Sequence, residues 1–206
     1  MIDSQYDIAK EFLTENNPII GSVLTSVEPL TTTFKPLNFG NTARIIINQQ
    51  LSGKAAQTIF NRVLKKVGAF TPLSILNTED DELRECGLSY AKISYIKGLA
   101  DKCLSDKNYL NNFLQLTDED ALDRIKSNKG FGIWSAQIFL LFHLRRPDIF
   151  PIGDATLITS ISEIYKFDKT DNEKIIQISK GWLPYRSIAC LALWQWFDDG
   201  KPKLMF

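Results

Sequence analysis

Residues 133–144 are the stretch that most restricts what this chain can fold into. The run IWSAQIFLLFHL is apolar around almost its whole circumference at helical spacing, so a helix there needs other elements packed around it. Helical spacing also dominates the rest of the sequence, whereas the alternating pattern typical of strands is nearly missing. We therefore predict an all-α fold in which residues 133–144 form the central, fully covered helix, ended by Pro147.

Capping residues and glycines predict the bounds of the other helices. Ser52 caps a helix that stops at Gly68, and Ser89 caps the next long one. Thr78 is expected to cap a short helix, and Thr117 to form a capping box in which Asp120 replaces the usual Glu. The predicted helices span residues 41–48, 52–67, 78–87, 89–105, 117–127, 133–144, 155–165, 172–180 and 185–197.

Composition restricts the class of protein. The 206 residues include 24 basic and 24 acidic side chains, so the net positive charge that steers most nucleic-acid binders is absent, and any contact with DNA must be local. Cys86, Cys103 and Cys190 are odd in number and widely spaced, which favours reduced thiols and excludes a four-thiolate iron–sulfur cluster. The polar start, residues 1–9, and the lack of a membrane-length apolar run indicate an intracellular protein.

Two glycine-containing motifs indicate where chemistry takes place. Gly130 and Gly132 precede the apolar helix, where they let the backbone approach a phosphate while the unpaired amides at the helix start attract the anion. Further on, the run Phe-Pro-Ile-Gly ends at Asp154, which places a carboxylate at the start of another helix. Asp154 is also an ordinary helix cap, and both roles are compatible.

The motifs resemble those of the helix-hairpin-helix base-excision DNA glycosylases, and in particular the 3-methyladenine DNA glycosylase II branch. The four matching motifs are NQQLS at 48–52, GFGIWSA at 130–136, RPDIFPIGD at 146–154 and WLPYRS at 182–187. The resemblance covers residues 38–197. It implies two lobes divided by a central cleft, with residues 1–38 packing near the C-terminal helices, residues 39–149 as the central lobe and residues 150–206 as the lobe that carries Asp154.

The resemblance implies an enzyme that binds double-stranded DNA and swings a damaged nucleotide out of the stack. The residues expected to fill the hole are Gln49, Gln50 and Leu51, with Gln50 as the best single choice. Taken without the other motifs, the two glutamines would be read as the polar end of a helix and Leu51 as core. The protein is expected to act as a monomer with no membrane partner, in the nucleoid of a bacterium or the nucleus of a eukaryote.

The hairpin would hold the strand through its main chain, a mode independent of sequence and of side-chain charge. The amides expected to bind phosphate are those of Gly130, Gly132 and Ile133. The family often has Pro just before the first hairpin glycine, whereas this chain has Lys129. A lysine there is expected to loosen the turn or to add a phosphate contact. The family often holds a monovalent cation, Na⁺ or K⁺, which here would sit on the backbone carbonyls of Lys126, Asn128 and Gly130. No other cofactor is expected, and a simple glycine turn between helices is the alternative.

Asp154 is the expected catalytic residue. Cleavage of the N-glycosidic bond leaves positive charge on the sugar, which a nearby carboxylate offsets, and the same group can orient or deprotonate the attacking water. Glycosylases that also cut the strand have a Lys two positions after the second hairpin glycine, but this chain has Trp134 there. The chain therefore resembles the monofunctional enzymes. The resemblance places Trp134 and Trp194 on the walls of the pocket for an electron-poor alkylated base, and the alternative is that either one is a core residue.

Other basic residues leave alternatives open. Arg186 is expected to contact the DNA backbone or to pair with an acid, and Lys54, Lys92 and Lys97 are either further phosphate contacts or ordinary surface lysines. His143, the only histidine, is expected to be structural. Besides a monofunctional glycosylase, two other functions are considered. The main alternative is a non-catalytic helix-hairpin-helix module that binds DNA, and the other is a glycosylase that also cuts the strand.

Overall fold

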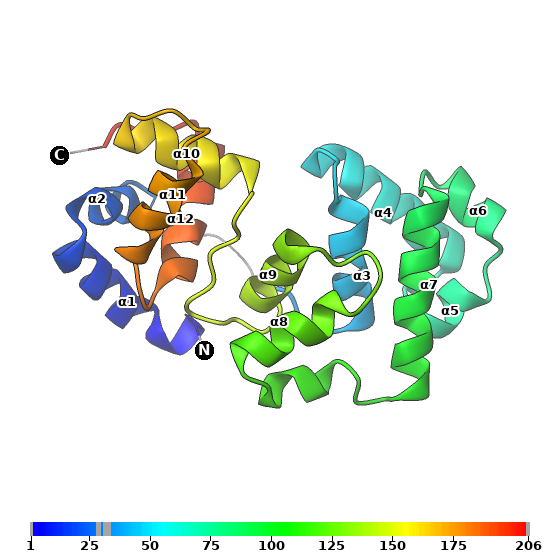
Figure 1. The fold of residues 1–206 in the computed structure, drawn as a ribbon. Helices are drawn as coiled ribbons and strands as arrows, with labels where there is room; N and C mark the ends of the chain where they lie inside the picture. The colour runs from blue at the N-terminus through cyan, green and yellow to red at the C-terminus, as the bar shows by residue number, and fades with distance from the viewer. Residues whose placement is uncertain (1, 28–29, 31–33, 205–206) are drawn as a thin grey trace. The chain divides into compact units, whose positions relative to one another are not determined.

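The computed structural model describes residues 2–27, 30 and 34–204, and every regular element in this part of the chain is a helix (Figure 1). The all-α prediction is confirmed. Among the described helices, none is both long and apolar enough to cross a membrane. The helices are α1 (Ile2–Asn16), α2 (Pro18–Ser26), α3 (Phe39–Asn48), α4 (Gly53–Val67), α5 (Pro72–Leu76), α6 (Asp80–Glu85), α7 (Tyr90–Ser105), the 3₁₀ helix η1 (Asn111–Gln115), α8 (Asp118–Lys126), α9 (Ile133–Phe142), α10 (Ala155–Tyr165), α11 (Asn172–Lys180) and α12 (Arg186–Asp198).

Of the five capping residues that the sequence indicates, four begin their helices, namely Ser52, Ser89, Thr117 and Asp154. Ser52, Ser89 and Asp154 each accept hydrogen bonds from backbone amides in the first turn of the helix that follows. Thr78 is the exception, because its hydroxyl donates to the carbonyl of Ser74 at 2.8 Å and so bonds to the end of α5. Glu79 occupies the cap position of α6 instead, and the prediction for Thr78 was wrong.

Helices α1, α2 and α5 were not predicted, although α2 and α5 carry start signals in the sequence. The side chain of Asn17 accepts from the amide of Ile20 at the start of α2, whose first residue is Pro18. Thr71 and Ser74 form a reciprocal capping box at the start of α5. An Asn or Thr followed by Pro is therefore a helix start in this chain.

The chain divides into two compact units, of which the first contains residues 1–34 and 145–206. Its central helix is α12, which packs against α1, α2 and α10 (Figure 1). The buried residues of α12 are Ser187, Ile188, Ala189, Cys190, Leu191, Ala192, Leu193, Gln195 and Trp196. Gln195 is buried and uses its Nε2 to donate to the carbonyl of Val27 at 2.8 Å, which satisfies the end of α2.

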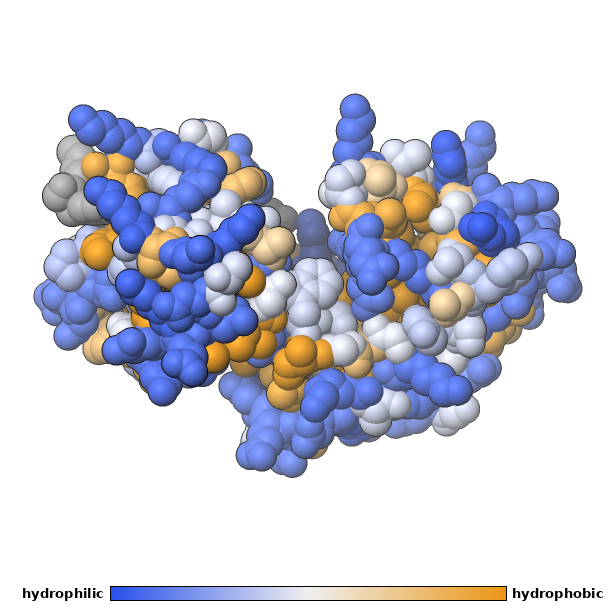
Figure 2. Space-filling model, turned by 45° about the horizontal axis from the view of Figure 1, so that its top comes forward, coloured by the Kyte–Doolittle hydropathy of each residue, from blue (hydrophilic) through white to orange (hydrophobic). Residues whose placement is uncertain are grey.

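The second unit contains residues 35–144, in which α3 packs against α4, α7 and α9, and α8 packs against α9. Helix α9 buries Phe139, Leu140 and Leu141, but Ile133 at its start is 44% exposed. The expectation that this helix is fully covered was therefore wrong for its first turn. The helix also ends at Phe142, well before Pro147. Hydrophilic side chains dominate the visible surface of each unit (Figure 2).

Candidate functional site

The hairpin between α8 and α9 is a turn held by its own polar groups. The amide of Phe131 donates to the carbonyl of Asn128 at 3.1 Å. The side chain of Asn128 is buried, where its Oδ1 accepts from the hydroxyl of Tyr109 at 2.8 Å and its Nδ2 donates to the carbonyl of Ile125 at 2.9 Å. Because these bonds satisfy both ends of the amide, the turn has a defined shape before any ligand binds.

The two hairpin glycines differ in how strictly the structure requires a glycine. Gly130 has a φ of +90°, and a Cβ there would lie 2.5 Å from the ring of Tyr95, so the position accepts only glycine. Gly132 has a φ of −83°, and a Cβ there would meet no atom within 4 Å. The first glycine therefore allows the turn to pack on α7, and the second leaves the backbone open on the exposed side.

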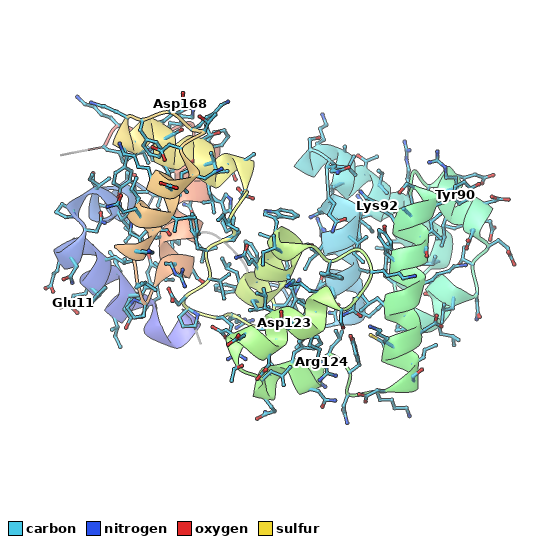
Figure 3. All side chains as sticks on the ribbon, in the orientation of Figure 1. Glu11, Tyr90, Lys92, Asp123, Arg124 and Asp168 are labelled. Carbon is cyan, nitrogen blue, oxygen red and sulfur yellow. The ribbon has the colours of Figure 1, made fainter. Side chains whose placement is uncertain are left out.

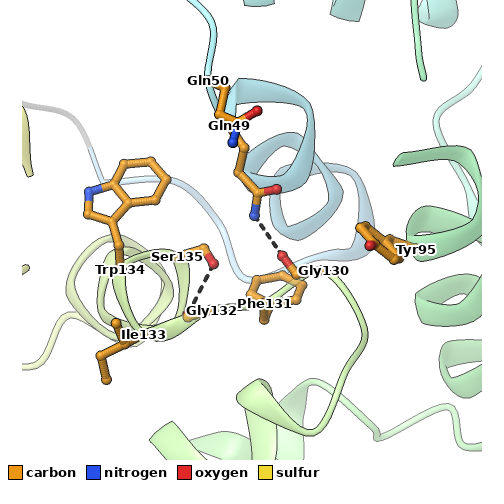
Figure 4. Close-up of a pocket in the computed structure, with 9 residues that line it drawn as sticks. All are labelled: Gln49, Gln50, Tyr95, Gly130, Phe131, Gly132, Ile133, Trp134 and Ser135. Carbon is orange, nitrogen blue, oxygen red and sulfur yellow. Dashed lines mark hydrogen bonds between the residues drawn. The ribbon is translucent and has the colours of Figure 1, made fainter. Parts of the chain in front are cut away.

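The start of α9 is the place where the sequence predicts a phosphate contact. No described side chain caps this helix at Gly132, and the positive end of the helix dipole favours an anion there. The hairpin and the first turn of α9 line an open groove of about 530 Å³, and Trp134 is one of the lining residues (Figure 4). The residues lining this groove are Gln49, Gln50, Tyr95, Gly130, Phe131, Gly132, Ile133, Trp134 and Ser135.

The loop after α3 lies beside the hairpin. Gln49 points toward it and donates from Nε2 to the carbonyl of Gly130 at 2.6 Å (Figure 4). Gln50 is exposed with a φ of +58°, and Leu51 is 38% exposed. The side chain of Gln49 is therefore fixed by a hydrogen bond, whereas Gln50 and Leu51 lie at the surface. Leu51 is not a core residue.

Two of the three carbonyls expected to hold a monovalent cation already accept a hydrogen bond. Gly130 accepts from Gln49, and Asn128 accepts from the amide of Phe131. A carbonyl oxygen has two lone pairs, so each of them retains capacity for an ion. Among the described residues, no cluster of His, Cys, Asp or Glu side chains could hold a metal.

Asp154 closes a tight turn in the first unit. The amide of Ile152 donates to the carbonyl of Phe150 at 2.8 Å, and the amide of Asp154 donates to the carbonyl of Pro151 at 3.1 Å. Gly153 makes the turn possible with a φ of +85°. The chain then enters α10 with Asp154 as its cap, as the sequence predicts.

One oxygen of the Asp154 carboxylate is held from two helices. Its Oδ1 accepts from the amides of Thr156 at 3.1 Å and Leu157 at 3.0 Å, and from the indole Nε1 of Trp194 on α12 at 3.0 Å. The carboxylate is half-buried. Burial raises the pKa of the neighbouring Cys190 thiol, and the charge of Asp154 raises it further, so this cysteine stays protonated and inert.

The segment before this turn is clamped to the start of α12. Arg186 pairs with Asp148 through two bonds, from Nε to Oδ1 at 2.8 Å and from Nη2 to Oδ2 at 2.9 Å. Ser187 accepts from the amide of Ile149 at 2.9 Å and donates to the carbonyl of Arg146 at 2.7 Å. Of the two roles expected for Arg186, the structure shows the pairing with an acid.

Two lysines that the sequence suggests as phosphate contacts are engaged elsewhere. Lys92 donates to the carbonyls of Ile47 and Gln49 at 2.8 Å each, and desolvation lowers its pKa. Lys97 donates to the carbonyl of Thr78 and pairs with Asp80. Lys129, in the hairpin itself, is exposed.

The predicted residues thus form two groups. Asp154, Trp194 and Arg186 lie in the first unit, while the 49–51 loop, the hairpin and Trp134 lie in the second. Two residues of this region could not be predicted from the sequence: Tyr95, which packs against Gly130, and Lys92, which donates to the carbonyl of Gln49. Neither has a local signal, because their partners lie more than a whole helix away along the chain. His143 is buried, as expected of a structural residue.

The chain is similar to known proteins in both sequence and structure. Residues 43–184 match the HhH-GPD superfamily of base excision DNA repair proteins. The alkylbase DNA glycosidase-like protein mag2 of Schizosaccharomyces pombe is 28% identical over 201 residues, covering 94% of each chain. DNA-3-methyladenine glycosylase 1 of the same organism is 29% identical over 157 residues, covering 74% of this chain and 69% of the relative. The solved structure of an S. pombe 3-methyladenine DNA glycosylase with abasic DNA superposes with a TM-score of 0.81 at 25% identity, covering 95% of this chain and 98% of that one.

Proposed function

We propose, from the premise that this chain belongs to the HhH-GPD superfamily of base excision DNA repair proteins, that it is a monofunctional alkylbase DNA glycosylase. It would evert an alkylated purine from duplex DNA, hydrolyse the N-glycosidic bond and leave an abasic site. Relatives named as 3-methyladenine DNA glycosylases support this substrate class. Within the superfamily we propose the 3-methyladenine DNA glycosylase II branch, acting as a monomer inside the cell.

The observation that carries the proposal is the fixed carboxylate of Asp154. Three N–H groups direct its Oδ1, so the carboxylate does not reorient when charge develops on the sugar. As the bond between C1′ and the base nitrogen breaks, the base leaves with the electron pair and the sugar becomes an oxocarbenium-like cation. Asp154 stabilises this cation and accepts a proton from the water that attacks C1′.

Trp134 supports both the substrate class and the nucleophile. It stands where a strand-cutting enzyme of this family has its lysine, so water is the nucleophile and no Schiff base forms. Its half-buried indole lines the groove beside the hairpin, where an aromatic face favours a cationic methylated purine. We also propose that the indole of Trp194, which donates to Asp154, contacts an alkylated base.

The hairpin would supply most of the DNA contact. The amides of Gly132 and Ile133 bind the phosphates next to the everted nucleotide, which needs no positive net charge. Exposed Lys129 adds a phosphate contact, and Gln50 fills the space left by the base. A Na⁺ or K⁺ ion on the hairpin carbonyls would strengthen the phosphate contact. Arg186 would contact the DNA backbone only while it stays paired with Asp148.

The test uses duplexes that each carry one defined lesion, such as N7-methylguanine, hypoxanthine or ethenoadenine, with alkaline cleavage of the abasic product. We expect release of at least one alkylated purine by the wild-type protein. Asp154→Asn keeps a good helix cap, so it should fold and bind DNA while losing excision by about a hundred- to a thousand-fold. Excision at the wild-type rate by this variant would refute the catalytic role of Asp154. A wild-type protein that binds an abasic duplex yet releases no base would be the non-catalytic module instead.

A further inference from the structure

Helix α7 anchors the loop that follows α3. Lys92 lies on the side of α7 toward α3 (Figure 3), and its ammonium donates to the carbonyls of Ile47 and Gln49 at 2.8 Å each. These carbonyls belong to the last turn of α3 and the residue after it, where no intrahelical partner exists. A positive charge at this end of α3 also interacts favourably with the helix dipole.

The same face of α7 supports the hairpin one turn further along. The ring of Tyr95 lies so close to Gly130 that a Cβ there would be 2.5 Å from it. Gln49 then joins the two loops, because its Nε2 donates to the carbonyl of Gly130 at 2.6 Å (Figure 4). Lys92, Gln49 and Tyr95 thus form a closed set of contacts between α7, the 49–51 loop and the hairpin, which we call the loop anchor.

The loop anchor fixes the residue that follows it. Gln50 is exposed and adopts a φ of +58°, a conformation that a residue with a side chain keeps only when its surroundings enforce it. The flanking carbonyl of Gln49 is held by Lys92, and the Gln49 side chain is held by Gly130. The position of Gln50 relative to the hairpin amides is therefore set inside one unit of the protein.

We propose that Lys92 is a positioning residue for nucleotide eversion, which keeps the 49–51 loop at a fixed spacing from the hairpin so that Gln50 enters the duplex as the hairpin grips the strand. The proposal rests on the glycosylase function proposed above. It differs from a phosphate contact, because the ammonium already donates to two carbonyls and is half-buried.

The test compares Lys92→Met, which removes the donors, with Lys92→Arg, which keeps them. The matched control is Lys97→Met on the same helix, because Lys97 also donates to a backbone carbonyl but on the α5–α6 side. Eversion is read from the fluorescence of 2-aminopurine in a duplex, and excision from single-turnover rates on a lesion in a stable pair and in a mismatch. The salt dependence of DNA affinity is measured for each variant.

We expect Lys92→Met to lower 2-aminopurine fluorescence and to slow excision of the stably paired lesion about tenfold, with a smaller loss on the mismatch, where eversion costs less. Lys92→Arg should restore most of the rate, and Lys97→Met should resemble the wild type. The proposal is overturned if Lys92→Met is unaffected, if it loses equally on both lesions, or if it reduces the salt slope of binding by about one, as a lost phosphate contact does. The fluorescence measurement needs no excision, so it tests Lys92 even if the wild-type protein releases no base.

Discussion

Trp194 donates its indole N–H to Oδ1 of Asp154 over 3.0 Å, although the two residues lie on different helices. The same oxygen accepts two amides of α10, so a side chain of α12 completes a bonding pattern that the helix cap alone leaves partial. Hydrogen bonds to an ionised carboxylate are stronger than neutral ones and restrict its orientation. The relationship links the packing of α12 to the geometry of the proposed catalytic group.

Replacing Trp194 with Phe removes the donor and keeps most of the ring. We expect the single-turnover excision rate to fall about tenfold, because one hydrogen bond to a charged group is lost at the reacting carboxylate. Trp196→Phe is the control, since Trp196 lies on the same helix and donates its indole N–H to the carbonyl of Pro202. Equal losses in both variants would assign the effect to helix packing and not to Asp154.

Replacing Gly130 with Ala should destabilise the second unit. Alanine at a φ of +90° is strained, and its Cβ would clash with the ring of Tyr95, so we expect a loss of about 2–4 kcal/mol in urea unfolding. Gly132→Ala provides the comparison, because its φ of −83° suits alanine and the site is open. If both variants unfold at the same urea concentration, the packing of Gly130 on Tyr95 contributes nothing to stability.

The stability of the protein should depend on pH through His143. Burial lowers the pKa of this residue from 6.5 to about 4, so the unfolded chain binds more protons than the folded chain between these values. The free energy of unfolding therefore loses nothing through His143 above pH 6.5, and it decreases by about 3 kcal/mol as the pH falls toward 4. Urea unfolding of the wild type and of His143→Gln across this range checks the effect. Parallel stability curves for the two proteins would contradict it.

The wild-type protein should form no covalent adduct with DNA. The position of the lyase lysine is occupied by Trp134, so sodium borohydride should trap no Schiff base on a lesion-bearing or abasic duplex. Denaturing electrophoresis of the borohydride-treated mixture makes the measurement. A trapped protein–DNA band would show that another amine attacks the sugar and that the monofunctional assignment is wrong.

Several elements could be predicted because their signals are local. Asp154 caps α10 as expected, and α10 and α11 have the predicted bounds. The prediction for Thr78 was wrong because a threonine hydroxyl can cap the helix after it or donate to the turn before it, and here it donates to the carbonyl of Ser74. Helix α9 was expected to be fully covered because it is apolar all round, but its first turn borders the groove at the hairpin.

The sequence by itself determined the helical class, the hairpin glycines, the cap at Asp154 and the absence of a lysine at position 134, because each depends on residues within a few positions of one another. Only the tertiary structure decided which distant residues hold the proposed site in place. Trp194 donates to Asp154, Lys92 donates to the carbonyl of Gln49, and Tyr95 packs against Gly130. These partners lie 40, 43 and 35 residues apart, so they meet only through the packing of helices. Local backbone preferences act over one or two turns, whereas the orientation of a functional side chain depends on which distant helix packs beside it.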